Sequence, residues 1–100
     1  MSDEKFEWDK NKAEKNYKKH KGISFEEAAS VFDDENAIIF DDPDHSKMED
    51  RFLLLGMSYM ANLLIVCHCY RENDGVIRII SARKATKSEE EQYNEITKGW

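Results

Sequence analysis

Residues Val76 to Thr86 run Val-Ile-Arg-Ile-Ile-Ser-Ala-Arg-Lys-Ala-Thr, and this stretch decides how the rest of the chain is interpreted. Its first half, Val76 to Ile80, is β-branched at every position except Arg78, a pattern that favours a central strand packed on both faces. Its second half turns polar at once and places Arg83 and Lys84 at the end of that strand. Two cations on a rigid sheet form a site for an anion such as phosphate, and the alternative is a basic loop in water.

The length and composition predict one domain. One hundred residues are enough for a single core, which we expect at about residues 6–97 of a domain that spans 1–100. The hydrophobic fraction of 40% and the charged fraction of 36% are typical of a soluble globular chain. No apolar run is long enough for a membrane span, and the acidic N-terminus does not resemble a secretion signal.

The only two cysteines, Cys67 and Cys69, predict a reducing location. They lie two residues apart in an apolar run, so on a strand they point to the same face and bridge poorly. No second pair exists to complete a zinc site. We therefore expect buried free thiols in a cytoplasmic protein.

Charge is distributed very unevenly along the chain. The net charge of -6 argues against a general nucleic-acid binder. Residues 10–21, however, hold six lysines and one glutamate, and the segment 51–87 is also basic. The acidic segment 22–50 separates them and could itself bind a basic partner. If folding brings the two basic segments together, they form a positive cleft on an acidic body.

The N-terminal third predicts two helices. Asp9 is a suitable N-cap for a helix that runs to about His20, since its carboxylate accepts N–H groups at the positive end of the helix dipole. Gly22 ends this helix. A second, short helix begins after Ser24, because Ser24 and Glu27 have the spacing of a capping box.

The rest of the chain predicts a meander and a final helix. Asp74-Gly75 between two apolar runs is a strong hairpin signal. The last helix begins near Thr86 or Ser88, because each is followed three residues later by a glutamate. We therefore predict an α+β fold in which N-terminal helices and a C-terminal helix pack on an antiparallel β-meander of about four strands. The expected strands are 37–40, 51–59, 63–71 and 76–82, with 5–8 as a further edge candidate.

Two histidines have roles that depend on the folded structure. Lys12, Asn16 and His20 recur at i, i+4 and i+8 of the first helix, which makes them either a solvated face or a row directed at a ligand. His68 interrupts the apolar middle strand, where it is either a hydrogen-bonded core residue or a catalyst that faces the cleft.

Acidic residues gather at 33–35 and in the proline-containing turn 41–45. Their spacing does not match the calcium loop of an EF-hand, which needs glycine at its sixth position and glutamate at its twelfth. We expect neither a metal nor another cofactor.

The chain also contains four distinctive pieces. They are Phe6-Glu7-Trp8-Asp9 with Lys12, Asn16, Lys19 and His20; Gly22 leading into Ser24-Phe25-Glu26-Glu27-Ala28; Asp42-Pro43-Asp44-His45-Ser46 followed by Arg51-Phe52; and Arg78-Ile79-Ile80-Ser81-Ala82-Arg83-Lys84-Ala85-Thr86. Together they resemble the BrnT family of bacterial toxins from about residue 6 to 95. One departure is Lys21, which stands between His20 and Gly22 where the family commonly has histidine followed directly by glycine.

The resemblance implies a RelE-like ribonuclease fold and a toxin of a type II toxin-antitoxin pair. Such a toxin cleaves RNA and arrests bacterial growth. Its partner is a ribbon-helix-helix antitoxin whose DNA-binding end represses the operon, so the toxin meets DNA only through the antitoxin.

The implied chemistry needs no metal, because the 2′-OH of RNA attacks the adjacent phosphate. The protein must then supply a base, an acid for the 5′-leaving oxygen, and cations for the charge that gathers on the phosphorane. His20 and His68 are the acid and base candidates, because histidine titrates near neutrality. The expected cations are Arg51, Arg83 and Lys84 at the phosphate, with Lys12 near the scissile bond.

Two other functions stay open from the sequence. One is a non-catalytic interaction module that acts as a co-repressor with a DNA-binding partner, which the acidic net charge favours. The other is a binding fold for an anionic metabolite. Detection of 2′,3′-cyclic phosphate ends on RNA separates a ribonuclease from both.

Overall fold

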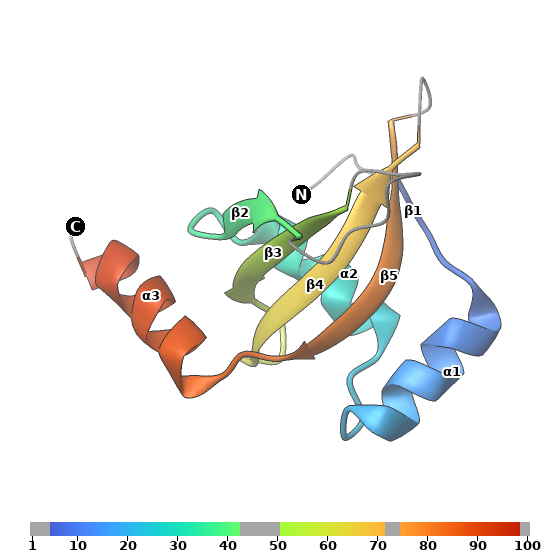
Figure 1. Ribbon diagram of the computed structural model, residues 1–100, viewed down its shortest axis with the longest axis horizontal. Coiled ribbons are helices and arrows are strands. Elements are labelled where there is room, and N and C mark those ends of the chain that lie inside the picture. The colour runs from blue at the N-terminus through green and yellow to red at the C-terminus, as the bar shows by residue number, and fades with distance from the viewer. Residues whose placement is uncertain (1–4, 43–50, 72–74, 99–100) are drawn as a thin grey trace.

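A five-stranded sheet with helices on both sides forms the part of the chain that the structure describes, residues 5–42, 51–71 and 75–98 of a computed structural model (Figure 1). The spatial order of the strands is β1-β5-β4-β3-β2. The strands are β1 Lys5–Glu7, β2 Ile38–Asp41, β3 Phe52–Met57, β4 Leu63–Tyr70 and β5 Val76–Lys84. The helices are α1 Lys10–Lys19, α2 Phe25–Ser30, the 3-10 helix η1 Val31–Asp33, and α3 Lys87–Lys98.

The sheet is mixed, which corrects the expected antiparallel meander of about four strands. Strands β2 to β5 do form an antiparallel meander. The edge candidate at the N-terminus is a fifth strand, β1, and it pairs in parallel with β5 through Lys5 and Val76. The middle strand is consequently β4, and β5 lies one place from the edge. Three residues of sequence carry no signal for a partner that lies so far along the chain.

One face of the sheet is covered by the N-terminal helices. Buried side chains from both layers form this core: Ile23, Phe25, Ala28, Val31, Leu54, Leu64, Val66, Ile79 and Ala82. Figure 1 shows α2 behind the sheet, with α1 and α3 at opposite ends of the molecule. On the other face, Tyr93 of α3 packs with Leu55 and Ile65. Leu64 and Val66 of β4 therefore face one layer, and Ile65 between them faces the other.

Strand β5 extends further than the sequence predicted. It runs through Lys84, because Arg83 pairs with Ile65 and Lys84 pairs with Leu64 of the neighbouring strand. The two cations therefore belong to the sheet itself and not to a loop after it. A backbone hydrogen-bonded on a strand fixes the starting point of each side chain.

The turn after α1 contains two consecutive residues with positive φ, Lys21 at 53° and Gly22 at 85°. The N–H of Gly22 donates to the carbonyl of Tyr17 at 2.8 Å, and the N–H of Ile23 donates to the carbonyl of His20 at 3.2 Å. Glycine adopts this left-handed backbone without cost, whereas lysine does so less readily. The turn holds His20 at the C-terminal end of α1.

The helix caps follow the sequence predictions at three points. Asp9 accepts from the N–H of Lys12 at 3.0 Å, and Ser24 Oγ accepts from the N–H of Glu27 at 3.0 Å. Of the two candidates for the last helix, the structure selects Thr86. Its N–H donates to Glu89 Oε1 at 2.8 Å, and its Oγ1 accepts from the N–H of Glu89 at 3.2 Å.

Glu27 completes no capping box. Its buried carboxylate instead accepts from Ser58 Oγ at 2.6 Å and from Asn62 Nδ2 at 2.8 Å. It thereby ties α2 to the connection between β3 and β4. Asp41 of the predicted turn 41–45 belongs to β2, and the rest of that turn from residue 43 on lies outside the described residues, as do residues 72–74 of the predicted turn 72–75.

Asn16 joins α1 to β5 with a buried side-chain amide. Its Nδ2 donates to the carbonyls of Ala82 at 2.9 Å and Ile23 at 3.2 Å, and its Oδ1 accepts from the N–H of Ala82 at 3.1 Å. The pairing of β1 with β5 ends at Arg78. Asn16 thus serves as the hydrogen-bond partner of Ala82 on the side of β5 that β1 does not reach.

We expect Asn16→Ala to lower the free energy of unfolding by about 2–4 kcal/mol, because it leaves backbone groups of Ala82 and Ile23 buried without a partner. Asn11→Ala is the matched control, since Asn11 is exposed on the same helix. Urea unfolding followed by circular dichroism measures both. Equal stability of the two variants would contradict this role of Asn16.

Candidate functional site

Two cavities on the molecule share one residue, Arg83. The smaller, which we name the His20 pocket, has a volume of about 330 Å³ and is lined by Lys19, His20, Lys21, Arg83, Lys84 and Thr86. The larger, which we name the sheet pocket, has a volume of about 630 Å³ and is lined by Phe40, Asp41, Asp42, Arg51, Leu53, Ile65, Cys67, Ile80, Ser81, Arg83 and Glu89. The end of the lysine-rich helix and the cationic end of β5 therefore meet, as the charge pattern of the sequence led us to expect.

Among the residues that line the His20 pocket, His20 is the one whose ordinary pKa lies near neutral pH. Burial lowers its pKa below the ordinary value of 6.5, and the positive charges of Lys19 and Arg83 lower the pKa further. The imidazole is consequently neutral at pH 7 and can accept a proton. Lysines 19, 21 and 84 and Arg83 surround it with positive charge.

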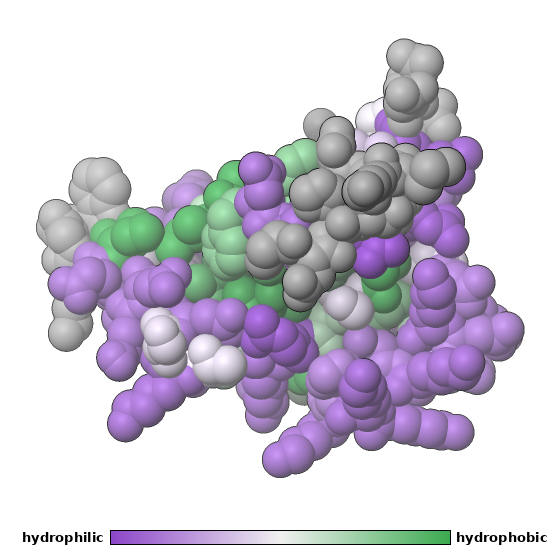
Figure 2. Space-filling model, in the orientation of Figure 1, coloured by the Kyte–Doolittle hydropathy of each residue, from purple (hydrophilic) through white to green (hydrophobic). Residues whose placement is uncertain are grey.

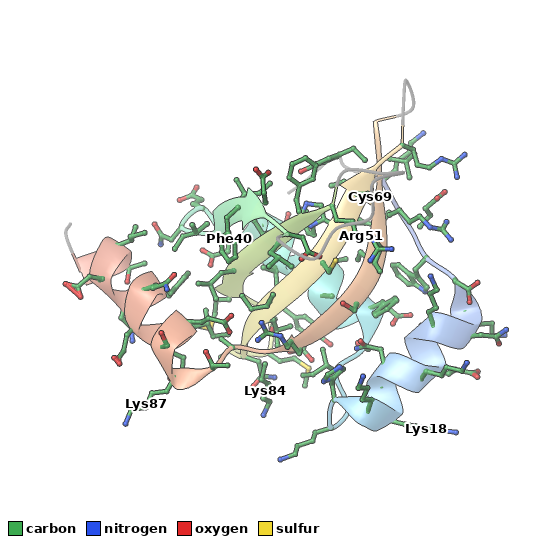
Figure 3. All side chains as sticks on the ribbon, viewed as in Figure 1. Lys18, Phe40, Arg51, Cys69, Lys84 and Lys87 are labelled. Atoms are coloured by element: carbon green, nitrogen blue, oxygen red, sulfur yellow. The ribbon has the colours of Figure 1, made fainter. Side chains whose placement is uncertain are left out.

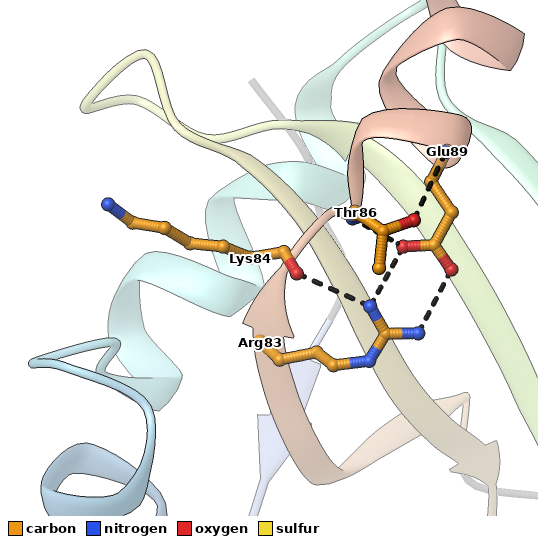
Figure 4. A network of polar contacts seen from close by, with 4 residues as sticks. All are labelled: Arg83, Lys84, Thr86 and Glu89. Carbon is orange, nitrogen blue, oxygen red and sulfur yellow. Dashed lines mark hydrogen bonds and ion pairs between the residues drawn. The ribbon is translucent and has the colours of Figure 1, made fainter.

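Arg83 is held by Glu89 of α3 (Figure 4). Its Nη1 and Nη2 donate to the two carboxylate oxygens at 2.8 and 3.0 Å, and Nη1 also donates to the carbonyl of Lys84 at 3.3 Å. The hydrogen bond from Arg83 lowers the pKa of Glu89 to about 2, against a smaller opposing effect of burial. Two parallel bonds fix the plane of the guanidinium group.

Lys84 extends away from this ion pair. In Figure 4 its ammonium group lies on the far side of the strand from the guanidinium of Arg83. In Figure 3 it projects below the end of β5, between α1 and α3. The two neighbouring cations thus face different directions from one strand end, as alternation along a strand requires.

The sheet pocket combines Arg51 with the polar side chains Cys67 and Ser81. Cys67 Sγ donates to Asp42 Oδ2 at 3.4 Å. Burial, with a further contribution from Asp42, raises the pKa of the Cys67 thiol to about 11. The thiol therefore stays protonated at neutral pH and does not act as a nucleophile.

Lys12 lines neither cavity. It is exposed in the first turn of α1, and its backbone N–H binds the cap residue Asp9. It lies seven residues before Lys19, which is about 10.5 Å along a helix. The structure therefore does not place Lys12 beside His20 and Arg83, where its predicted role near the scissile bond requires it.

His68 lies in the core and not in the cleft. Its side chain is fully buried, with Nδ1 3.1 Å from the carbonyl oxygen of Val66 and Nε2 3.3 Å from the hydroxyl of Tyr70. The ring meets Phe32 of η1 edge to face at 4.8 Å. The face of β4 that carries His68 is thus the one beneath the helices, opposite Cys67. Of the two open interpretations, the structure supports the hydrogen-bonded core residue.

Asp34, in the acidic segment 33–35, serves the fold. Asp34 Oδ2 accepts from the hydroxyl of Tyr93 at 2.6 Å and from the N–H of Met57 at 2.8 Å, and Oδ1 accepts from the N–H of Asn36 at 2.9 Å. This carboxylate joins α3 to the end of β3. Within the described residues no group of three or more His, Cys, Asp or Glu side chains is arranged to hold a metal ion.

The sequence patterns do not assign Lys21, Asn16 and Glu89 to the site. Asn16 belongs to a polar row and to one of the four distinctive pieces, and neither indicates its contact with β5. Lys21 is a departure from the family pattern, and Glu89 has the spacing of a capping box with Thr86. No local signal shows that one glutamate both caps a helix and binds Arg83, because the second contact depends on where α3 packs.

The surface around the site is strongly polar. Figure 2 shows hydrophilic residues over α1 and along the lower edge of the molecule, with apolar residues between α1 and α3. Figure 3 shows Lys18 of α1 and Lys87 of α3 extending outward on either side of Lys84. Within the described residues no helix is long and apolar enough to cross a membrane.

Comparison with known proteins gives the family. Residues 8–89 match the family described as "Ribonuclease toxin, BrnT, of type II toxin-antitoxin system". This match covers most of the chain. The chain belongs to the BrnT family. Its members are ribonuclease toxins, so this protein is an enzyme whose family implies an antitoxin partner.

A solved structure supports the fold of this BrnT-family protein. The 1.1 Å crystal structure of the ribonuclease toxin BrnT of Brucella abortus matches with a TM-score of 0.63 and 22% sequence identity. The match covers 84% of this chain and 99% of that one. None of the curated proteins matches the chain. The structural comparison therefore supports the α+β fold, and the site must be argued from this chain's own residues.

We expect the imidazole of His20 to titrate below pH 6.5 when followed by NMR, because burial and the positive charges of Lys19 and Arg83 disfavour its charged form. Lys19→Gln removes one of these charges, so the pKa should rise toward 6.5. Lys18→Gln is the matched control, because Lys18 lines neither cavity. A pKa that is unchanged by Lys19→Gln would contradict this electrostatic account.

The ion pair between Arg83 and Glu89 should make stability depend on acid pH. The folded-state pKa of Glu89 is about 2, below its ordinary 4.5, so the stabilisation is complete above pH 4.5 and is lost as the pH falls toward 2. Glu89→Gln keeps the cap acceptor but removes the charge. We expect it to cost about 1–2 kcal/mol at pH 7 and little at pH 2, because Arg83 is partly exposed to solvent. Urea unfolding at both pH values measures this, with exposed Glu91→Gln as control.

Proposed function

We propose that this BrnT-family protein cleaves RNA through attack of the 2′-OH on the adjacent phosphate, without a metal, in the manner of RelE-like ribonucleases. The observation that supports the proposal best is a neutral histidine surrounded by cations at the junction of α1 and β5. General-base catalysis at neutral pH needs a base that is unprotonated there.

His20 is the proposed base. It takes the proton of the 2′-OH while O2′ forms a bond to phosphorus and the bond to the 5′-oxygen breaks. The products are a 2′,3′-cyclic phosphate and a 5′-hydroxyl end. The negative charge of a bound phosphate close to His20 opposes the effect of the nearby cations. It therefore stabilises the imidazolium that forms during the reaction.

The cations are proposed to stabilise the phosphorane. Arg83 presents a guanidinium group in a fixed plane because Glu89 holds two of its N–H groups, and Arg51 lies in the adjoining sheet pocket. Lys84 reaches the His20 pocket from the other side of the strand end, and we assign it the proton for the leaving 5′-oxygen. Preorganised donors of this kind need no rearrangement as charge develops.

The partner is proposed to be a ribbon-helix-helix antitoxin in the cytoplasm. Membership of the BrnT family implies an antitoxin partner. The ribbon-helix-helix type is what the resemblance noted in the sequence implies. A cytoplasmic location agrees with the two free thiols, Cys67 and Cys69. DNA is then contacted by the antitoxin and not by this chain.

The experiment is a comparison of purified wild type with Arg83→Ala and His20→Ala on a mixed-sequence RNA. Wild type should give 2′,3′-cyclic phosphate ends, and each variant should lower the rate by about 10²-fold or more. Arg71→Ala is the matched control, since Arg71 is an exposed arginine whose ion pair is with Glu7, away from both cavities.

Expression of the same variants in bacteria tests the biological role. Arg83→Ala should abolish growth arrest and still bind the antitoxin, which shows that it is folded. A fully toxic Arg83→Ala would remove this residue from the mechanism. Wild type that never yields cyclic phosphate ends would instead favour the co-repressor alternative.

A further inference from the structure

The net charge of α1 and the turn after it is opposite in sign to that of the rest of the protein. Residues 10–21 carry six lysines against one glutamate, a net charge of +5. The whole chain has a net charge of -6, so the remaining residues carry -11. The positive field of this segment attracts a polyanion even though the protein as a whole is acidic.

Only part of this charge stabilises the helix. Lys18 and Lys19 stand in the last turn, where cations are favoured, whereas Lys12 and Lys15 do not. At the N-terminal end the N-cap Asp9 is acidic, but the first turn itself contains no acidic residue. Lys12, Lys15 and Lys19 follow one another at i, i+3 and i+7, a spacing that brings like charges together on one face. All three are exposed, and among the described residues none of them forms an ion pair with a carboxylate. The fold therefore leaves these charges available for a ligand.

These three residues, which we name the lysine row, lead into the His20 pocket. Lys19 belongs to both, since it lines that pocket beside His20. The row runs back from there along α1 for about 10.5 Å to Lys12. Asn16 lies between Lys12 and His20 and is bonded to Ala82, so the helix that carries the row is fixed to the strand that carries Arg83.

We propose that the lysine row binds the phosphates of a single RNA strand that continues from the scissile bond, and that Lys12 and Lys15 act in substrate binding and not in the chemical step. This inference rests on the proposed ribonuclease function. It deepens that function, because it makes the substrate an RNA that extends several nucleotides to one side of the cleaved bond. An acidic protein partner would match the charge, but only the RNA strand explains why the row ends at His20.

The test measures binding separately from cleavage. The probe is a fluorescein-labelled uridine 12-mer with 2′-O-methyl riboses, which cannot react because the nucleophile is blocked. Its affinity is measured by anisotropy between 50 and 200 mM KCl for wild type and for the double variant Lys12→Gln/Lys15→Gln. The matched control is Lys5→Gln/Arg71→Gln, which removes two exposed cations that lie outside α1 and line neither cavity.

Each phosphate contact on a single strand contributes about 0.7 to the slope of log affinity against log salt. The row variant should therefore reduce the size of the slope by about 1.4 and weaken binding about 25-fold at 0.1 M salt. The control variant should stay within about twofold of wild type, because long-range effects of exposed charges are screened.

Equal affinities and slopes for the two double variants would overturn the proposal. So would a row variant that binds the RNA probe normally but loses binding to poly-glutamate, because that result assigns the row to an acidic protein. Failure of the proposed function has a different signature: wild type binds the 12-mer but produces no cyclic phosphate ends from unmodified RNA. If wild type cleaves RNA but the row variant binds the 12-mer as wild type does, the inference about the lysine row fails and the proposed ribonuclease function stands.

Discussion

The arrangement of this protein depends on the hydrogen bonds between the side-chain amide of Asn16 and the backbone of Ala82. Strand β1 pairs with β5 only as far as Arg78, so the backbone groups beyond that point need another partner. Asn16 supplies both a donor and an acceptor to Ala82 from a helix. His20 follows one turn later, and Arg83 follows Ala82 directly. The amide that satisfies the sheet therefore also places the imidazole beside the guanidinium.

Arg83 connects this junction to the other end of the chain. Glu89 caps α3 through Thr86 and at the same time binds both terminal nitrogens of Arg83. Tyr93, one turn further along α3, donates to Asp34 and packs with Leu55 and Ile65. The C-terminal helix is thus anchored at two points, and the first of them orients a side chain of the site. The same contacts therefore stabilise the packing of α3 and position the side chain of Arg83.

The local features of the sequence predicted local structure well. Asp9, Ser24 and Thr86 cap helices as expected, because a side-chain oxygen within three residues of an N–H group needs nothing distant. The predicted strands 37–40, 51–59, 63–71 and 76–82 each coincide with a strand of the sheet. Predictions that needed distant contacts were less successful. The parallel pairing of β1, the burial of His68 against Phe32 and the position of Lys12 outside both cavities all depend on how separate elements pack.

The sequence by itself determined the family, the strands β2 to β5, the three capped helices and the concentration of lysines in one segment. Each of these follows from residue types at short spacing, where hydrogen bonds and side-chain periodicity act within a few residues. Only the tertiary structure decided that His20 and not His68 meets Arg83, and that Glu89 holds the guanidinium. The physical reason is that Asn16 and Ala82 are 66 residues apart in the sequence, and their hydrogen bonds exist only once the sheet and the helix have packed.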